Sequence, residues 1–95
     1  MSAMTYLEEA RQVLRDEAQA LLVLADSLGE NFEKTVQCLL CIRGRIAVTG
    51  MGKSGHVARK IAATLASTGS PAYFIHPAEA SHGDLGMMTP DDAVI

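Results

Sequence analysis

A short apolar run followed by a glycine-rich loop and a helical pattern most constrains the fold of this chain. Residues 45–51, RIAVTGM, are apolar and β-branched, which is typical of a buried parallel strand. A helix is predicted from Ser54 to about Thr68, with Gly69 where a C-terminal cap belongs. Residues 71–76, PAYFIH, predict a second strand. Strand, helix and strand form a βαβ unit, so the two strands should be parallel and adjacent.

Two helices are predicted before the first strand. The first covers about residues 3–28, and Gly29 ends it. The second runs from an N-cap at Asn31 to about Cys41. Leucines recur every seven residues along the first helix, a spacing that favours a subunit contact and hence a homo-oligomer. This leucine stripe consists of Leu7, Leu14, Leu21 and Leu28.

The predicted fold class is α/β: the first half of a doubly wound parallel sheet preceded by two N-terminal helices. Residues 1–43 are assigned to the helices, and residues 44–95 to the first part of the sheet domain. The final residues 91–95, DDAVI, predict the start of a third strand, in which the domain is cut short. Because a parallel sheet needs helices on both faces, we expect the chain to be a fragment.

Length and charge limit the function classes. The chain has 95 residues and a net charge of -3, which predicts one small domain and argues weakly against a nucleic-acid partner. Between Glu33 and Glu79 lie six basic residues and no acidic one, so this segment could attract an anion or form a solvated basic face. Glu8 and Glu9 stand where a signal peptide needs an apolar run, and no run approaches the ~20 residues of a membrane span. We therefore expect a cytoplasmic protein with no membrane partner.

Cys38 and Cys41 form a single C-x-x-C inside the second predicted helix. A metal or redox site needs a second pair or a suitable histidine, and neither is nearby. Two reduced, half-buried thiols are therefore the favoured interpretation.

The glycine loop contains Gly50, Gly52 and Gly55 in the spacing G-x-G-x-x-G. A P-loop also requires a glycine five residues before Gly52, and that position is Ala47, so the P-loop interpretation fails. A dinucleotide site requires an acid at the end of the second strand, but that strand ends at His76 and a proline. Dinucleotide binding is therefore disfavoured, and a short anion-receptive loop at a helix N-terminus remains.

The carboxyl ends of the two strands should meet at one edge of the sheet, where open α/β sheets bind ligands. The glycine loop brings Lys53 to this edge, and the segment after the second strand brings several polar residues. Several of these residues also have a structural explanation: His76 could simply end the strand, Glu79 could be a solvated helix residue, and Asp84 could support a turn. His56, in the first turn of the predicted helix, is interpreted as a surface residue. Lys53 and His82 are favoured for proton chemistry on a small phosphorylated ligand. The polar residues of the second segment are His76, Glu79, Ser81, His82 and Asp84.

Residues 44–95 closely resemble the sugar isomerase (SIS) domain of arabinose-5-phosphate isomerases, the enzymes that feed Kdo synthesis for lipopolysaccharide. The resemblance rests on the motifs GMGKSG, STG-P and HP-EA-HGDLGM and covers over half of the chain. It implies a flavodoxin-like sheet and interconversion of D-arabinose 5-phosphate and D-ribulose 5-phosphate through an enediol, without a cofactor.

The resemblance also implies roles for individual residues. Lys53 falls on the active-site lysine, and Gly69 and Ser70 fall on residues that contact substrate. His76 and His82 fall on two substrate-contacting histidines, and His76 also on a site for an inhibitory zinc ion. Ser54 follows the lysine and is assigned to substrate binding. Physically, Lys53 would offset enediolate or phosphate charge, and His82 would move a proton or assist ring opening.

The resemblance also places functional segments beyond this chain. The family continues into a Ser/Thr-rich phosphate-binding loop and glutamates suited to act as bases, and many members add CBS domains. We therefore expect the 95 residues alone to be inactive. The alternative hypothesis is a non-catalytic SIS module that senses a sugar phosphate. The acidic N-terminal arm, in place of a DNA-binding helix-turn-helix, favours the enzyme.

Overall fold

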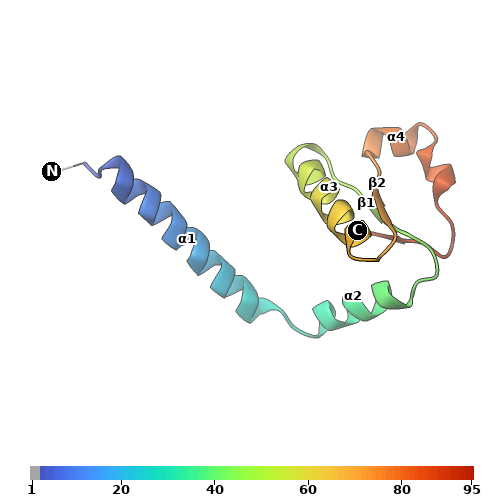
Figure 1. Cartoon of the computed structure of the whole chain (residues 1–95), viewed down its shortest axis with the longest axis horizontal. Helices are drawn as coiled ribbons and strands as arrows, with labels where there is room; N and C mark the ends of the chain where they lie inside the picture. Colours follow the sequence, from blue (N-terminus) through green and yellow to red (C-terminus); the bar gives the residue numbers. More distant parts are fainter. Residues whose placement is uncertain (1–2) are drawn as a thin grey trace. The chain divides into compact units, whose positions relative to one another are not determined.

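The computed structural model describes residues 3–95, which form two compact units (Figure 1). The first unit ends at Thr35, and the second covers Val36–Ile95. None of the described helices is both long and apolar enough to cross a membrane. The elements in chain order are α1 (Tyr6–Ser27), α2 (Glu30–Cys41), β1 (Ile46–Val48), α3 (Gly52–Ser67), β2 (Ala72–Phe74), α4 (Pro77–Ser81), the 3-10 helix η1 (Asp84–Met87) and β3 (Ala93–Val94).

Helix α1 begins at a capping box. Thr5 Oγ1 accepts a hydrogen bond from Glu8 N at 3.1 Å, and the Glu8 carboxylate accepts one from Thr5 N at 2.9 Å. These two bonds satisfy backbone donors that a helix start leaves open. The prediction of an N-cap at Asn31 was wrong. Helix α2 begins at Glu30, and the Asn31 carbonyl instead accepts a bond from the Thr35 hydroxyl within the helix.

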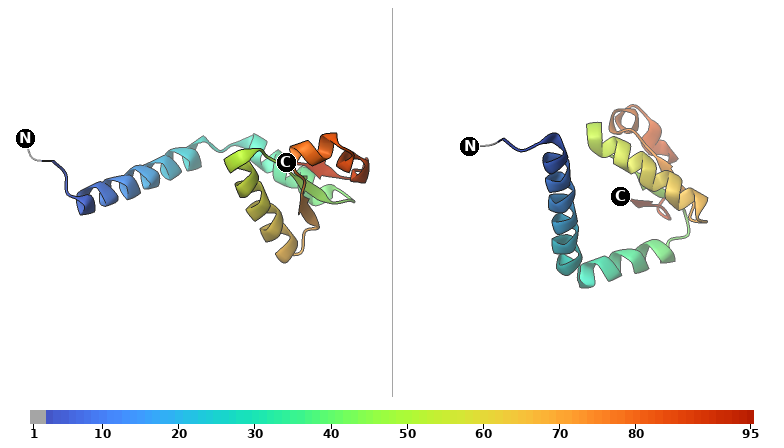
Figure 2. Two further views of the ribbon diagram at one scale, coloured as in Figure 1. Left: turned by 90° about the horizontal axis from the view of Figure 1, so that it is seen from above. Right: turned by 60° about the vertical axis from the view of Figure 1, so that its left-hand side comes forward.

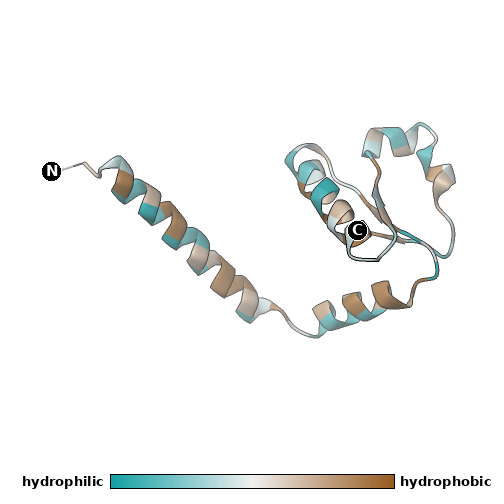
Figure 3. Cartoon of the chain, viewed as in Figure 1, coloured by the Kyte–Doolittle hydropathy of each residue, from teal (hydrophilic) through white to brown (hydrophobic). Residues whose placement is uncertain are grey.

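The leucine stripe lies on a helix that buries no residue within this chain. Apolar and polar bands alternate along α1 (Figure 3), as expected for an amphipathic helix. Leu7, Leu14 and Leu21 are all exposed, as is Leu28, which follows the helix as its C-cap. Helix α1 is therefore amphipathic, but its apolar face packs against nothing among the described residues.

The second unit contains a three-stranded parallel sheet in the order β2-β1-β3. Strand β1 pairs with β2 in the register Ile46 with Ala72, and with β3 in the register Ile46 with Ala93. The predicted parallel pairing of the first two strands is confirmed, and so is the α/β class with helices preceding a small parallel sheet. Because the chain passes from β1 to β2 on one side and returns to β3 on the other, the strand order reverses beside β1.

The core lies between β1 and α3. Ile46 and Val48 are buried beside Ala58 and Ala62, and Ala47 is fully buried. Helix α3 runs alongside the sheet in both views of Figure 2. The small residues of its inner face let the helix approach the sheet closely.

Gly69 ends α3 as predicted. Its φ is +102°, which favours glycine, and its N–H donates to the Ala66 carbonyl at 3.4 Å. Ser70 N donates to the Leu65 carbonyl at 2.9 Å. These two bonds form the Schellman arrangement, which satisfies carbonyls that the helix end leaves open and turns the chain into β2.

Candidate functional site

The glycine loop joins β1 to α3 at the carboxyl edge of the sheet. Gly52 has a φ of +56°, which side-chain-bearing residues rarely adopt. Gly50 has no room for a side chain, since a Cβ there would lie 2.8 Å from the carbonyl carbon and oxygen of Ser54. Gly55 is buried against the same part of the loop. The G-x-G-x-x-G spacing therefore has a packing explanation that needs no nucleotide.

The N-terminus of α3 is open to an anion. Met51 is its N-cap and provides no side-chain hydrogen bond, and the first helical bond runs from Gly55 N to the Met51 carbonyl at 3.3 Å. The backbone N–H groups of the first turn therefore face the loop, where the helix dipole favours negative charge.

Lys53 and Ser54 line a hollow of about 320 Å³ at the same edge. We call it the carboxyl-edge hollow. It lies beside β1 and Ile95, where the strand order reverses and ligands of open α/β sheets bind. Its lining is mostly apolar and includes the polar residues Thr49, Lys53 and Ser54, which is the usual composition of a small-molecule pocket. The lining residues are Val48, Thr49, Lys53, Ser54, Val57, Ala58, Ile61 and Ile95.

His76 lies on the other side of the glycine loop. It lines a second hollow of about 210 Å³, the glycine-loop hollow, with Gly50, Gly52, Gly55, His56, Arg59 and Phe74. The Arg59 guanidinium carbon lies 4.1 Å from the centroid of the Phe74 ring, and that ring meets His76 edge-on at 6.5 Å. Sequence reasoning placed His56 on the surface and gave Arg59 no role. Both are exposed, and both border this hollow.

His76 also caps α4. Its Nδ1 accepts a hydrogen bond from Ala78 N at 3.1 Å, so the proton of the neutral ring is on Nε2. A ring in that state has no free lone pair for a metal. Among residues 3–95, no three His, Cys, Asp or Glu side chains cluster as metal ligands. The described residues therefore do not fit a zinc site at His76, and the inhibitory zinc ion stays a prediction that needs a turned ring and further ligands.

The prediction that the two cysteines are half-buried was wrong. Cys38 and Cys41 are both free and exposed on α2. The reason is that only Leu39 and Ile42 of this region pack against the core of the second unit.

The segment after His76 carries the remaining polar residues. Glu79 and Ser81 lie in α4, where Ser81 Oγ donates to the Ala78 carbonyl at 2.8 Å, and His82 is the exposed C-cap of this helix. Asp84 opens η1 after Gly83, whose φ is +130°. His82 is absent from the linings of the two hollows described above. Its assigned role in proton transfer stays a prediction.

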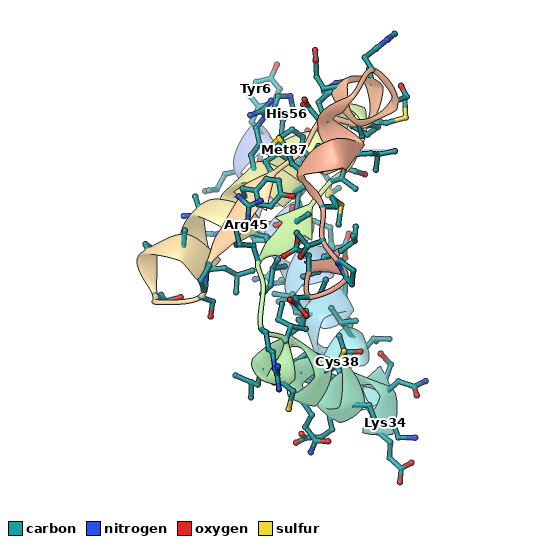
Figure 4. The ribbon with its side chains drawn as sticks, turned by 90° about the vertical axis from the view of Figure 1, so that its right-hand side faces the viewer. Tyr6, Lys34, Cys38, Arg45, His56 and Met87 are labelled. Atoms are coloured by element: carbon teal, nitrogen blue, oxygen red, sulfur yellow. The ribbon has the colours of Figure 1, made fainter. Side chains whose placement is uncertain are left out.

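Arg45 ties this segment back to the sheet. Its guanidinium donates to the Met87 carbonyl at 3.2 Å and lies 4.4 Å from the centroid of the Tyr73 ring. Arg45 and Met87 are labelled in Figure 4. Its backbone N–H donates to Asp92 Oδ1 at 2.7 Å, while Thr89 N donates to Asp92 Oδ2 at 2.8 Å. The backbone hydrogen bonds from Arg45 and then Thr89 lower the pKa of Asp92 below its usual 3.8.

Gly69 and Ser70 lie at the opposite edge of the sheet. They follow α3 and precede β2, which places them at the amino edge of the sheet. There they line a third hollow of about 200 Å³ with Gly44, Ile46 and Pro71. Within one chain the structure does not bring them together with Lys53. Their assignment to substrate binding remains a prediction. A substrate bound beside Lys53 in the carboxyl-edge hollow would not contact them within the same chain.

These features define a class: a parallel α/β domain with an anion-receptive loop at the carboxyl edge of its sheet. The particular family follows from comparison with known proteins. Residues 38–95 match the SIS domain family, and the chain belongs to it.

Three relatives illustrate the likeness. The chain is 52% identical, over 95% of its length, to the Pseudomonas aeruginosa protein named arabinose 5-phosphate isomerase KdsD, of which it covers 28%. It is 47% identical over 95% of its length to the Escherichia coli K12 protein of the same name, of which it covers 27%. A solved Escherichia coli CFT073 protein in complex with arabinose 5-phosphate superposes with a TM-score of 0.84 at 39% identity, over 96% of this chain and 50% of that one. The chain thus spans only about a quarter of the curated relatives' length.

Proposed function

We propose that this chain is the N-terminal part of a sugar-phosphate aldose–ketose isomerase. Its substrates would be D-arabinose 5-phosphate and D-ribulose 5-phosphate, in the cytoplasmic supply of Kdo for lipopolysaccharide. The observation that carries the proposal is the identity of 52% over 95% of the chain to a protein of that name. The carboxyl-edge hollow supports it, because Lys53 and an uncapped helix start meet there.

The proposed chemistry follows from what each group can do. Isomerisation moves a proton between C2 and C1 of the sugar through an enediolate, and a second proton between the two oxygens. The Lys53 ammonium would offset the negative charge that develops on the enediolate or that the phosphate carries. His82 would move the proton between oxygens or assist ring opening, and it would have to approach the hollow to do so. Ser54 would hold the sugar by a hydrogen bond in the carboxyl-edge hollow, and His76 would have to reach it from the glycine-loop hollow on the other side of the loop.

A binding measurement on the chain tests the site. We expect arabinose 5-phosphate to shift the backbone amide resonances of Gly52, Lys53 and Ser54 in an NMR titration. Arabinose without phosphate should shift them less, because the helix start and Lys53 recognise the anion. The amides of α1 provide an internal reference. Shifts confined to residues outside the glycine loop would argue against this site.

The alternative, a non-catalytic module that senses a sugar phosphate, makes the same binding prediction. It differs in predicting no proton exchange at the sugar C2. Loss of deuterium from arabinose 5-phosphate labelled at C2 would therefore favour the enzyme, in a protein that carries the complete domain.

A further inference from the structure

Thr49 connects all three strands at the carboxyl edge of the sheet. Its backbone N–H donates to the Ile95 carbonyl, beyond β3, at 2.8 Å. Its hydroxyl donates to the Ile75 carbonyl, beyond β2, at 2.6 Å. The residue is half-buried and lines the carboxyl-edge hollow. A single residue after β1 thus bonds the residues that directly follow β2 and β3.

The hydroxyl stands where the ladder between β1 and β2 ends. The preceding bond runs from Ile75 N to the Val48 carbonyl at 3.0 Å. Two residues after Val48, at Gly50, the chain turns away into the glycine loop, and the Thr49 hydroxyl donates to the Ile75 carbonyl in place of a ladder N–H. Ile75 is buried, at 6% exposure, so its carbonyl depends on this donor. Leaving such a carbonyl unpaired is costly.

Each bonded residue directly precedes part of the proposed site. Thr49 precedes the loop that carries Lys53, and Ile75 precedes His76. We propose that Thr49 is a positioning residue whose hydroxyl fixes the glycine loop against the strand end that carries His76. The consequence for ligand binding rests on the proposed function, whereas the geometric role does not.

A valine at this position keeps the branched shape and removes only the hydroxyl. Serine keeps the hydroxyl and loses the methyl group, so it should restore the geometry. Thr35→Val is the matched control, because Thr35 also donates its hydroxyl to a backbone carbonyl, that of Asn31 at 2.7 Å in α2. If Thr49→Val does not fold, Thr49→Ala compared with Thr49→Ser isolates the hydroxyl at equal loss of the methyl group.

The test is amide hydrogen exchange on the full 95-residue chain, read by NMR. In Thr49→Val we expect the amides of Ile75 and Ala78 to exchange about tenfold faster, since the strand end and the cap on His76 lose their anchor. The Ile46 amide, which bonds the Pro71 carbonyl at the opposite edge, should change little. Thr49→Ser and Thr35→Val should both match the unmodified chain at Ile75 and Ala78.

Two results would overturn the proposal. Unchanged exchange at Ile75 and Ala78 would show that the hydroxyl anchors nothing. Equal acceleration at Ile46 would show that it contributes only to global stability. In parallel, the dissociation constant for arabinose 5-phosphate should rise about tenfold in Thr49→Val and recover in Thr49→Ser. If the unmodified chain does not bind this ligand, the proposed binding role of the glycine loop is at fault within these 95 residues, and the exchange data still decide the role of Thr49.

Discussion

The backbones of Gly50 and Gly55 touch across the loop: a Cβ on Gly55 would lie 2.7 Å from the Gly50 carbonyl oxygen. The loop closes only because neither residue has a side chain. We expect Gly55→Ala to lower the free energy of unfolding by about 1–3 kcal/mol, as overpacking at a buried site does. Chemical denaturation measures this. Gly29→Ala is the control, with no atom within 4 Å of its Cβ, and should change stability by less than about 0.5 kcal/mol. Equal stability of the two variants would contradict the contact.

This contact also shows what the sequence could and could not predict. The strand, loop and helix pattern predicted the βαβ unit, because a short apolar run and a helix-capping glycine are local signals. The spacing of Gly50 and Gly55 did not distinguish ligand binding from backbone contact, since both require the absence of a side chain. The position of Ser70 at the amino edge of the sheet, away from Lys53, could have been predicted, because a residue just before a parallel strand lies at that edge. The hydrogen bond from the Thr49 hydroxyl to Ile75 could not be predicted from the sequence, because the two residues are 26 positions apart.

Asp92 predicts a specific acid sensitivity. Its folded-state pKa lies below the usual 3.8, so its contribution to stability is present above that value and is lost as pH falls through the folded-state pKa. We expect Asp92→Asn to lower the unfolding temperature at pH 7 and to weaken its decline below about pH 4. Asp91→Asn removes the same charge from the exposed neighbour and should leave the acid decline intact. Identical pH profiles of the two variants would contradict the role of Asp92.

The leucine stripe predicts self-association. Leu14 and Leu21 are 65% and 67% exposed within the chain, and an exposed apolar helix face usually marks an interface. We propose that α1 lies in the interface of a homo-oligomer. Replacing both leucines by Asp should dissociate or unfold it in sedimentation velocity experiments. Gln19→Asp, on the opposite side of α1, should leave the sedimentation coefficient unchanged. A compact monomer of the unmodified chain at micromolar concentration would contradict the proposal.

The role of Lys53 can be separated from its effect on folding. It is exposed at the start of α3, so Lys53→Ala should leave the unfolding temperature nearly unchanged. The same variant should weaken binding of arabinose 5-phosphate at least about tenfold, because an ammonium group near a phosphate or enediolate is lost. Lys60→Ala removes an equal charge from the exposed face of α3, and its affinity should change much less. Equal losses of affinity in both variants would indicate a general effect of charge.

The most direct test of the proposed isomerase is activity in a complete domain. Residues 1–95 would replace the matching segment of the Pseudomonas aeruginosa relative, to which the chain is 52% identical over 95% of its length. Conversion of arabinose 5-phosphate to ribulose 5-phosphate is then measured for this chimera and for its Lys53→Ala variant. The account predicts turnover in the chimera and a loss of at least about a hundredfold in kcat in the variant, with both proteins folded. A folded chimera without activity, or a variant with unchanged kcat, would contradict it.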